Sequence, residues 1–329
     1  MQKFLKFNPI YKEKIWGGRK LASLGRNLPD GKIGESWEIS DFENDLSIIA
    51  NGDLKGTTLR ECFKKYKNEI FGQCFKNDEG FPLLIKIIDA NDKLSVQVHP
   101  DNEYAKNFDP MSKGKKECWF ILNAEDRAEI VCGFSKEVSR EEYSNLINNN
   151  QAEFPLYYRK VKKGDTFLIE PGTVHAIGSG NLILEIQQSS DSTYRVYDYG
   201  RLGEDGKPRA LHLKKALDVL NFKKSTDSEV LKEHLIAKDR YLLTSNDKFR
   251  IEKIKISGEF QIPNMFKEPS FHILSVLDGK ITIEGTILNI GDTILITALG
   301  ILEGLSCTAS EHTEFALIGC GTDWLEPSI

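Results

Sequence analysis

Gln97 and His99, two polar residues one position apart in a strand-like segment, are the first residues whose spacing points to chemistry. From residue 94 to residue 98, apolar side chains alternate with polar ones, which predicts a β-strand. Ser95, Gln97 and His99 therefore project from one face of that strand. On a half-buried face each of these groups needs a polar partner, and a metal ion would serve the amide and the imidazole. A strand with an ordinary solvent-exposed polar face explains the segment equally well.

Two later segments add a carboxylate and a second imidazole. Glu117 shares one face of a predicted strand over residues 115–122 with Lys115, and a turn, a strand and a second turn lead to His175. Two imidazoles, a carboxylate and an amide oxygen suit a borderline divalent ion such as Zn²⁺, with a position left open for water or substrate. The same histidines and carboxylate could hold Fe(II) or Mn(II), so the ligand types leave the metal undecided.

The strand predicted over residues 181–187 presents Glu185 and Gln187 on one face, opposite its leucines. The polar run that follows is predicted to be a loop, and it carries Arg195 near the end of this strand. Both Glu185 and Arg195 are therefore candidates for a site at this edge of the fold.

Three short helices are predicted to support these strands. Thr58-Leu-Arg-Glu61 is a capping box followed by apolar residues at helical spacing, and Ser139-Arg-Glu-Glu142 is a second capping box. Apolar residues between positions 213 and 220 mark a third helix. We expect the first of these helices to be core scaffolding.

Six other polar residues have a structural interpretation on the sequence alone. An isolated histidine is more often a satisfied core or surface residue than a ligand, and isolated glutamates are more often solvated than catalytic. We interpret the following residues in this way: His212, His234, His272, His312, Glu35 and Glu38.

An internal repeat divides the chain. The hexapeptide Gly164-Asp165-Thr166-Phe167-Leu168-Ile169 recurs 127 positions later as Gly291-Asp292-Thr293-Ile294-Leu295-Ile296. Its spacing predicts two copies of a small barrel with glycine turns, and the second copy lacks a set of ligands. We expect one domain over residues 1–235 with the metal site and a degenerate second domain over 236–329. The charged segment 223–245 is the predicted connection.

Composition restricts the class of protein. The 329 residues are 40% hydrophobic with a formal charge of −5, which argues against a nucleic-acid or anionic-membrane surface. The amino terminus lacks the apolar core of a signal peptide, and no stretch approaches 18 apolar residues. The six cysteines form no Cys-x-x-Cys pair, so we expect reduced thiols and a cytoplasmic protein.

Taken in order, these motifs resemble the type I mannose-6-phosphate isomerases, which are zinc enzymes built from cupin barrels. The resemblance covers most of the chain and is strongest in residues 81–90, 94–101, 115–117, 171–176 and 194–201. It implies a mostly β fold with a few helices and two cupin-type (jelly-roll) β-barrels, the first elaborated with short helices. Longer members insert a helical domain for which this chain has no room, so it resembles the compact bacterial form.

The resemblance also assigns site residues. It implies one zinc ion per chain with the family's four ligands at Gln97, His99, Glu117 and His175. The family's active-site arginine corresponds to Arg195, a lysine near the metal to Lys115, and an active-site carboxylate to Glu185. Ser95 matches a serine that lines the same pocket. The spacing around Glu185 and Arg195 differs slightly from that in the longer forms.

The implied activity is the interconversion of mannose 6-phosphate and fructose 6-phosphate by proton transfer between C1 and C2 through an enediolate. Glu185 is the candidate base, while Arg195 and Lys115 would supply positive charge for the enediolate or the phosphate. The alternatives are an Fe(II) cupin oxygenase and a non-catalytic sugar-binding bicupin. The sequence leaves open the strictness for mannose over glucose and the oligomeric state.

Overall fold

β-Strands dominate the protein, in a computed structural model that describes residues 2–72, 80–203, 206–321 and 323–325. The chain forms two compact units. The central unit comprises residues 11–36 and 86–231, and the terminal unit comprises residues 1–10, 37–85 and 232–329. The prediction of a mostly β protein with a few short helices is confirmed.

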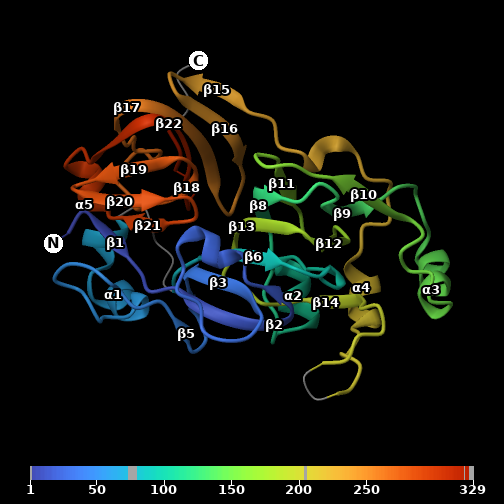
Figure 1. Ribbon diagram of the computed structural model, residues 1–329. Helices are drawn as coiled ribbons and strands as arrows, with labels where there is room; N and C mark the ends of the chain where they lie inside the picture. Colours follow the sequence, from blue (N-terminus) through green and yellow to red (C-terminus); the bar gives the residue numbers. More distant parts are fainter. Residues whose placement is uncertain (1, 73–79, 204–205, 322, 326–329) are drawn as a thin grey trace. The chain divides into compact units, whose positions relative to one another are not determined.

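The central unit is built from a five-stranded and a six-stranded sheet (Figure 1). The first has the order β10 (Leu156–Lys160), β9 (Glu129–Phe134), β12 (His175–Ile177), β7 (Val96–Val98), β14 (Tyr194–Tyr197). The second has the order β11 (Thr166–Ile169), β8 (Glu117–Ala124), β13 (Asn181–Gln188), β6 (Leu83–Ala90), β3 (Ile33–Ile39), β2 (Ile10–Gly18). The boundaries between the two units fall inside β2, β3 and β6.

One apolar core joins these two sheets. It contains Trp119 and Ile121 from β8 together with Ile130 and Cys132 from β9, all buried. Strands of the two sheets therefore pack face to face, as in other two-layer β structures. Polar side chains that share the inner face are enclosed with this core, which is why the alternation in β7 and β8 matters for function.

The terminal unit contains a nine-stranded sheet and its own core. The order is β1 (Phe4–Lys6), β21 (Thr293–Ile296), β18 (His272–Asp278), β22 (Ser306–Gly319), β17 (Arg250–Gln261), β16 (Arg240–Ser245), β15 (His234–Ala237). Strands β19 (Lys280–Ile283) and β20 (Thr286–Asn289) form a hairpin that joins β22. A short two-stranded sheet pairs β4 (Asp41–Phe42) with β5 (Asp45–Leu46).

The helices are short and their predicted caps are present. In α1 (Leu59–Lys65) the Thr58 hydroxyl accepts from the Glu61 amide while the Glu61 carboxylate accepts from the Thr58 amide. Ser139 caps α3 (Arg140–Asn148), and the third predicted helix is α4 (Leu213–Val219). The remaining helices are α2 (Asn102–Phe108), α5 (Ala298–Leu302), η1 (Lys20–Leu24), η2 (Lys67–Phe71) and η3 (Asp227–Glu229).

The repeated hexapeptide forms the same local structure twice. Gly164 and Gly291 have φ values of 92° and 84°, the left-handed region that glycine adopts without strain. Two residues later β11 and β21 begin, and each pairs antiparallel with a long strand, β8 and β18 respectively. The prediction that the hexapeptide marks a repeated turn and strand is confirmed.

Two sequence interpretations were wrong. Arg195 is not in a loop. It is the second residue of β14, because this segment pairs antiparallel with β7 and Arg195 lies opposite Gln97. Glu35 and Glu38 are buried rather than solvated, since every residue of β3 is buried in the sheet. The segment 223–245, predicted to connect the two domains, contains η3, β15 and β16 and includes the change of unit at 231/232.

The domain boundary at 235/236 stays a prediction, and it lies near the change of unit at 231/232. The cysteines in the described part of the chain, Cys62, Cys118, Cys132, Cys307 and Cys320, are buried thiols, while Cys74 lies outside the described residues. Among the described residues no helix is long and apolar enough to cross a membrane.

Candidate metal centre

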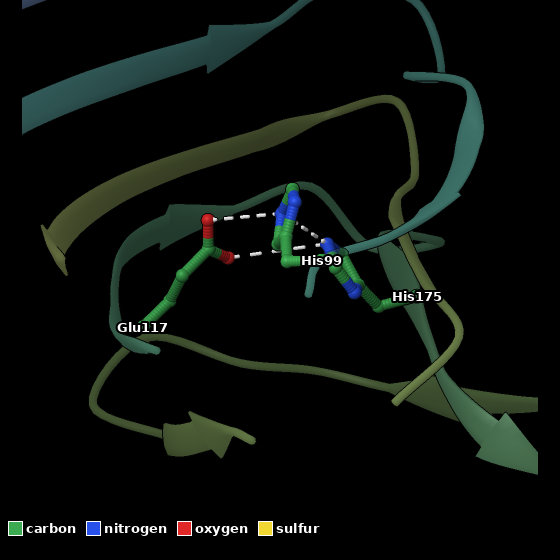
Figure 2. Close-up of side chains that lie close together, drawn as sticks. All are labelled: His99, Glu117 and His175. Atoms are coloured by element: carbon green, nitrogen blue, oxygen red, sulfur yellow. Dashed lines mark hydrogen bonds and ion pairs between the residues drawn. The ribbon is translucent and has the colours of Figure 1, made fainter. Parts of the chain in front are cut away.

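His99, Glu117 and His175 converge inside the central unit (Figure 2). Their nearest nitrogen and oxygen atoms lie within 4.8 Å of one another, and all three side chains are buried. The two Nε2 atoms are 3.1 Å apart, and Glu117 Oε1 lies 3.2 Å from Nε2 of His99. Glu117 Oε2 lies 3.9 Å from Nε2 of His175. The three groups come from the segment after β7, the start of β8 and the start of β12.

Backbone carbonyls determine the tautomer of both imidazoles. Nδ1 of His99 lies 2.7 Å from the carbonyl oxygen of Ser192, and Nδ1 of His175 lies 2.9 Å from that of Thr173. A carbonyl oxygen only accepts, so each Nδ1 carries the proton and each Nε2 presents a lone pair. Two lone pairs and a carboxylate thus face a common point. Metal-binding histidines usually donate their other ring N–H to a carbonyl or carboxylate, as both histidines do in this protein.

Electrostatics keep these groups in the protonation states that a divalent cation requires. Burial lowers the pKa of His99 to about 3, with the nearby Lys115 ammonium adding to the effect, and burial likewise lowers the pKa of His175. Burial opposes ionisation of Glu117, but Lys115 and His99 together bring its pKa well below the usual range. Neutral imidazoles and an ionised carboxylate are the forms that bind metal.

The spacing of the ligand atoms also fits a metal. Tetrahedral Zn²⁺ with bonds of about 2.0–2.1 Å separates its ligand atoms by about 3.3 Å. The two Nε2 atoms are 3.1 Å apart, and the Glu117 oxygens lie 3.2 Å (Oε1) from Nε2 of His99 and 3.9 Å (Oε2) from Nε2 of His175, all near that value. The residues therefore suit a small divalent ion without large rearrangement.

Gln97 lies beside this trio and is the centre of a cross-strand row. In the five-stranded sheet its register partners are His175 on β12 and Arg195 on β14. Directly opposed residues share a face, so the three side chains project together. Gln97 Nε2 lies 3.2 Å from His175 Nε2. Rotating the Gln97 amide by 180° would put its oxygen where Nε2 now lies, beside His175. Gln97 could then serve as a fourth ligand.

Lys115 supplies a buried positive charge to the cluster. Its Nζ lies 2.5 Å from Glu117 Oε1 and 3.3 Å from His99 Nε2, and the residue is only 3% exposed. Ser95 is also buried and directly precedes β7. Of the three predicted substrate-binding residues, Lys115 contacts the trio directly, and Arg195 lies opposite Gln97 in the sheet.

Glu185 is linked to the trio through Trp119. The indole Nε1 of Trp119 donates to Glu185 Oε2 at 2.8 Å and to Glu117 Oε2 at 3.1 Å. Burial raises the pKa of Glu185, and the nearby Glu117 carboxylate raises it further. Glu185 therefore holds its proton more readily than an exposed glutamate does, a property that suits a group that must take up and release one.

Lys86 is a site residue that the sequence interpretation missed. Its Nζ lies 3.0 Å from Glu185 Oε1, and both side chains are only 4% exposed. Burial favours the neutral amine, but the carboxylates of Glu185 and Glu35 raise the pKa of Lys86 and keep it charged. A single lysine inside the apolar run 81–89 was the available signal, because a buried charge is retained only with a partner.

Arg195 is half-buried at the end of the cross-strand row. One terminal nitrogen donates to the carbonyl oxygen of Ala210 at 2.8 Å, while its Nε is buried and has no hydrogen-bond partner among the described residues. Burial lowers its pKa, and so does the positive charge of Arg209. A buried donor without a partner in the described part of the chain is costly unless a water molecule, an ion or a ligand group satisfies it.

Comparison with known proteins decides the family. Residues 4–116 match the family model for phosphomannose isomerase type I, catalytic domain. Mannose-6-phosphate isomerase ManA of Bacillus subtilis is 39% identical over 278 residues, which cover 83% of this chain and 85% of the relative. The chain belongs to the type I phosphomannose isomerase family. The mannose-6-phosphate isomerase of Streptococcus mutans is 40% identical, covering 86% and 89% of the two chains.

Solved structures agree with this family. The crystal structure of the mannose 6-phosphate isomerase from Bacillus subtilis matches 97% of this chain and 100% of its own, with 34% identity and a TM-score of 0.84. A mannose 6-phosphate isomerase bound with zinc and yttrium shares the fold at 16% identity, with a TM-score of 0.77 and coverage of 98% and 100%. The resemblance inferred from the ordered motifs is confirmed.

Proposed function

We propose that this chain interconverts mannose 6-phosphate and fructose 6-phosphate at a metal centre formed by Gln97, His99, Glu117 and His175. Membership of the type I family makes it an aldose–ketose isomerase. The observation that carries the metal centre is the convergence of two unprotonated Nε2 atoms, 3.1 Å apart, on the Glu117 carboxylate. We propose one zinc ion per chain, because imidazole and carboxylate ligands at this spacing suit it best.

When bound, the ion supplies electrophilic polarisation of the sugar carbonyl. Neighbouring groups hold three of its proposed ligands: the Ser192 and Thr173 carbonyls orient the two histidines, and Trp119 donates to Glu117. Such support keeps a site in one geometry and contributes to its affinity for metal.

Glu185 is the proposed base of the proton transfer. The Glu185 carboxylate would take the proton from C2 of the aldose, the C2–H electron pair would form the C1–C2 double bond, and the carbonyl oxygen would take up negative charge. Transfer of the C2 hydroxyl proton to the oxygen on C1, with return of the carbon-bound proton from Glu185 to C1, would give the ketose with its carbonyl at C2. A positioned base of this kind typically contributes about 10²–10⁴-fold. Its raised pKa and its link through Trp119 to the trio support this role.

Lys115 and Arg195 are the proposed cations for the enediolate or the phosphate. Lys115 lies within hydrogen-bonding distance of two proposed ligands, so its ammonium is close to the reacting oxygens. Arg195 has a buried Nε without a partner in the described part of the chain, and its planar fork suits an oxyanion. Ser95 is proposed to line the same pocket from the start of β7.

We also propose that the chain is a bicupin, with a catalytic domain over residues 1–235 and a degenerate domain over 236–329, and that it acts in the cytoplasm. The repeated turn and strand at Gly164 and Gly291 supports the duplication. None of the described contacts specifically favours an oxygenase or a non-catalytic sugar-binding protein.

The test is an isomerase assay combined with metal analysis on the same preparation. We expect about one zinc per chain, turnover of mannose 6-phosphate to fructose 6-phosphate, and loss of turnover after chelation with recovery on adding zinc. Dioxygen consumption instead of isomerisation would support the oxygenase. Sugar binding without turnover at full metal content would support the binding protein and overturn the proposal.

A further inference from the structure

Three hydrogen bonds connect Arg195 to a short segment just before α4. The Arg195 backbone amide donates to Nδ1 of His212 at 3.1 Å, and the His212 amide donates to the Arg195 carbonyl at 2.8 Å. The guanidinium donates to the carbonyl oxygen of Ala210 at 2.8 Å. Both the backbone and the side chain of Arg195 are thus held by residues 210–212.

His212 precedes the first turn of α4, but its side chain does not cap that helix. It is the N-cap residue of α4, where a side-chain oxygen commonly accepts from the first turn of a helix and contributes about 0.5–2 kcal/mol. His212 makes no such capping bond. Its acceptor nitrogen is turned instead to the backbone of β14, so this residue binds the strand rather than its own helix.

The His212 ring is kept in the form that can accept. Burial lowers its pKa, Arg195 and Lys215 lower it further, and only Asp109 acts in the opposite direction. A neutral ring whose Nδ1 accepts carries its proton on Nε2. A protonated ring would lose the bond to the Arg195 amide.

Helix α4, which follows His212, is held in place by contacts with Asp109. Asp109 accepts from Lys215 on α4 at 2.8 Å and from the Tyr194 hydroxyl at 2.8 Å, which ties the helix to the residue beside Arg195. The Tyr194 and His212 rings lie 6.5 Å apart at an interplanar angle of 53°. A strand residue held by an anchored helix has little freedom to shift.

We infer that His212 is a positioning residue that fixes Arg195 opposite Gln97 for the isomerase reaction. The inference rests on the proposed role of Arg195. Its geometric basis is the order of contacts: His212 binds the Arg195 backbone, and Arg195 is the cross-strand partner of Gln97. A shift of about 1 Å in such a group can lower turnover about 100-fold.

Four variants test this inference, with kcat and KM measured for each: Arg195→Ala, His212→Phe, His212→Asn and the double variant Arg195→Ala/His212→Phe. Phenylalanine keeps the ring but removes Nδ1, whereas the asparagine amide oxygen can replace it as acceptor. We expect His212→Phe to lower kcat about 10- to 100-fold with KM little changed. His212→Asn should retain most of the turnover. His234→Phe, at an exposed histidine of β15, is the matched control and should behave as the parent protein.

The double variant separates positioning from general damage. If His212 acts through Arg195, the double variant should be no slower than Arg195→Ala, because coupled residues are not additive. An additional loss in the double variant would overturn the inference. Normal kcat in His212→Phe together with a lowered kcat in Arg195→Ala would overturn the positioning role of His212 and leave the proposed role of Arg195 standing. Normal kcat in Arg195→Ala would overturn this inference, and normal kcat together with normal KM would overturn the proposed role of Arg195 as well. Zinc content and thermal unfolding of each variant confirm that the fold is intact.

Discussion

His272 occupies in β18 the register position that Glu117 occupies in β8. Glu117 pairs with Ile169 at the end of the first repeated hexapeptide, and His272 pairs with Ile296 at the end of the second. Both His272 nitrogens are used by backbone: Nε2 accepts from the Met265 amide at 3.0 Å, and Nδ1 lies 2.9 Å from the Ser270 carbonyl oxygen. The same position thus holds a carboxylate of the proposed metal site in one repeat and a structural histidine in the other.

We predict that the second repeat binds no metal. His272→Ala removes two buried hydrogen bonds and should destabilise the fold by about 1–3 kcal/mol. Neither it nor His312→Ala should change metal content or turnover, because the terminal unit has no cluster of three ligand side chains among its described residues. Metal analysis and steady-state assays of the folded variants decide the point; loss of a tightly bound ion from either one would refute it.

His272 should also contribute to the pH dependence of stability. Burial lowers its folded-state pKa to about 3, while an unfolded histidine titrates near 6.5. Protons therefore bind the unfolded chain first, so this contribution is complete above pH 6.5 and declines as pH falls toward 3. By pH 5 the loss should reach about 2 kcal/mol. The free energy of unfolding of the parent and of His272→Gln, measured with urea between pH 8 and pH 5, tests this. An equal loss of unfolding free energy with falling pH in the two proteins would contradict the prediction.

Removing either histidine of the trio should abolish metal binding and activity without unfolding the chain. His99→Ala and His175→Ala each delete one ligand and leave the apolar core between the two sheets intact. We expect metal content near zero, turnover near background and an unchanged circular dichroism spectrum. His234→Ala is a suitable control on an exposed strand. Retention of both zinc and activity in His99→Ala would show that the site lies elsewhere.

Arg195→Ala should distinguish transition-state stabilisation from tethering of the phosphate. If the guanidinium stabilises the enediolate, kcat and kcat/KM should fall together with KM little changed. A buried donor of this kind contributes about 3–4 kcal/mol in comparable sites, or about 10²–10³ in rate. Arg195→Lys should recover part of the loss, since it keeps the charge but not the planar fork. A raised KM with normal kcat would instead assign Arg195 to uniform binding of the phosphate.

The buried pair of Lys86 and Glu185 should matter for activity more than for stability. Lys86→Met leaves the Glu185 carboxylate buried without this partner and should cost about 3–5 kcal/mol. The double variant Lys86→Met/Glu185→Leu replaces the pair by apolar side chains and should regain most of that stability. It should remain inactive, because the proposed base is absent. Denaturant unfolding and kinetics on both variants provide the check, and an active double variant would exclude Glu185 as the base.

The sequence by itself determined the local structure around the site. Alternation over residues 94–99 and 115–122 was enough to place Gln97 and His99 on one face of a strand and Glu117 and Lys115 on one face of another, because the side-chain period of a strand is a local property. The caps of α1 and α3 and the two hexapeptide turns followed from residues within four positions of one another. The ordered motifs also sufficed for the family.

Only the tertiary structure decided which of these residues meet. Arg195 lies in a strand opposite Gln97, and Lys86 forms an ion pair with Glu185. Both contacts join segments about a hundred positions apart in the chain. The partner of His212 and the burial of Glu35 have the same origin. Strand register between distant segments depends on the packing of the whole sheet, and no local period encodes it. A polar residue in the sequence therefore acquires its partner, and with it its charge and its role, only when the sheets have formed.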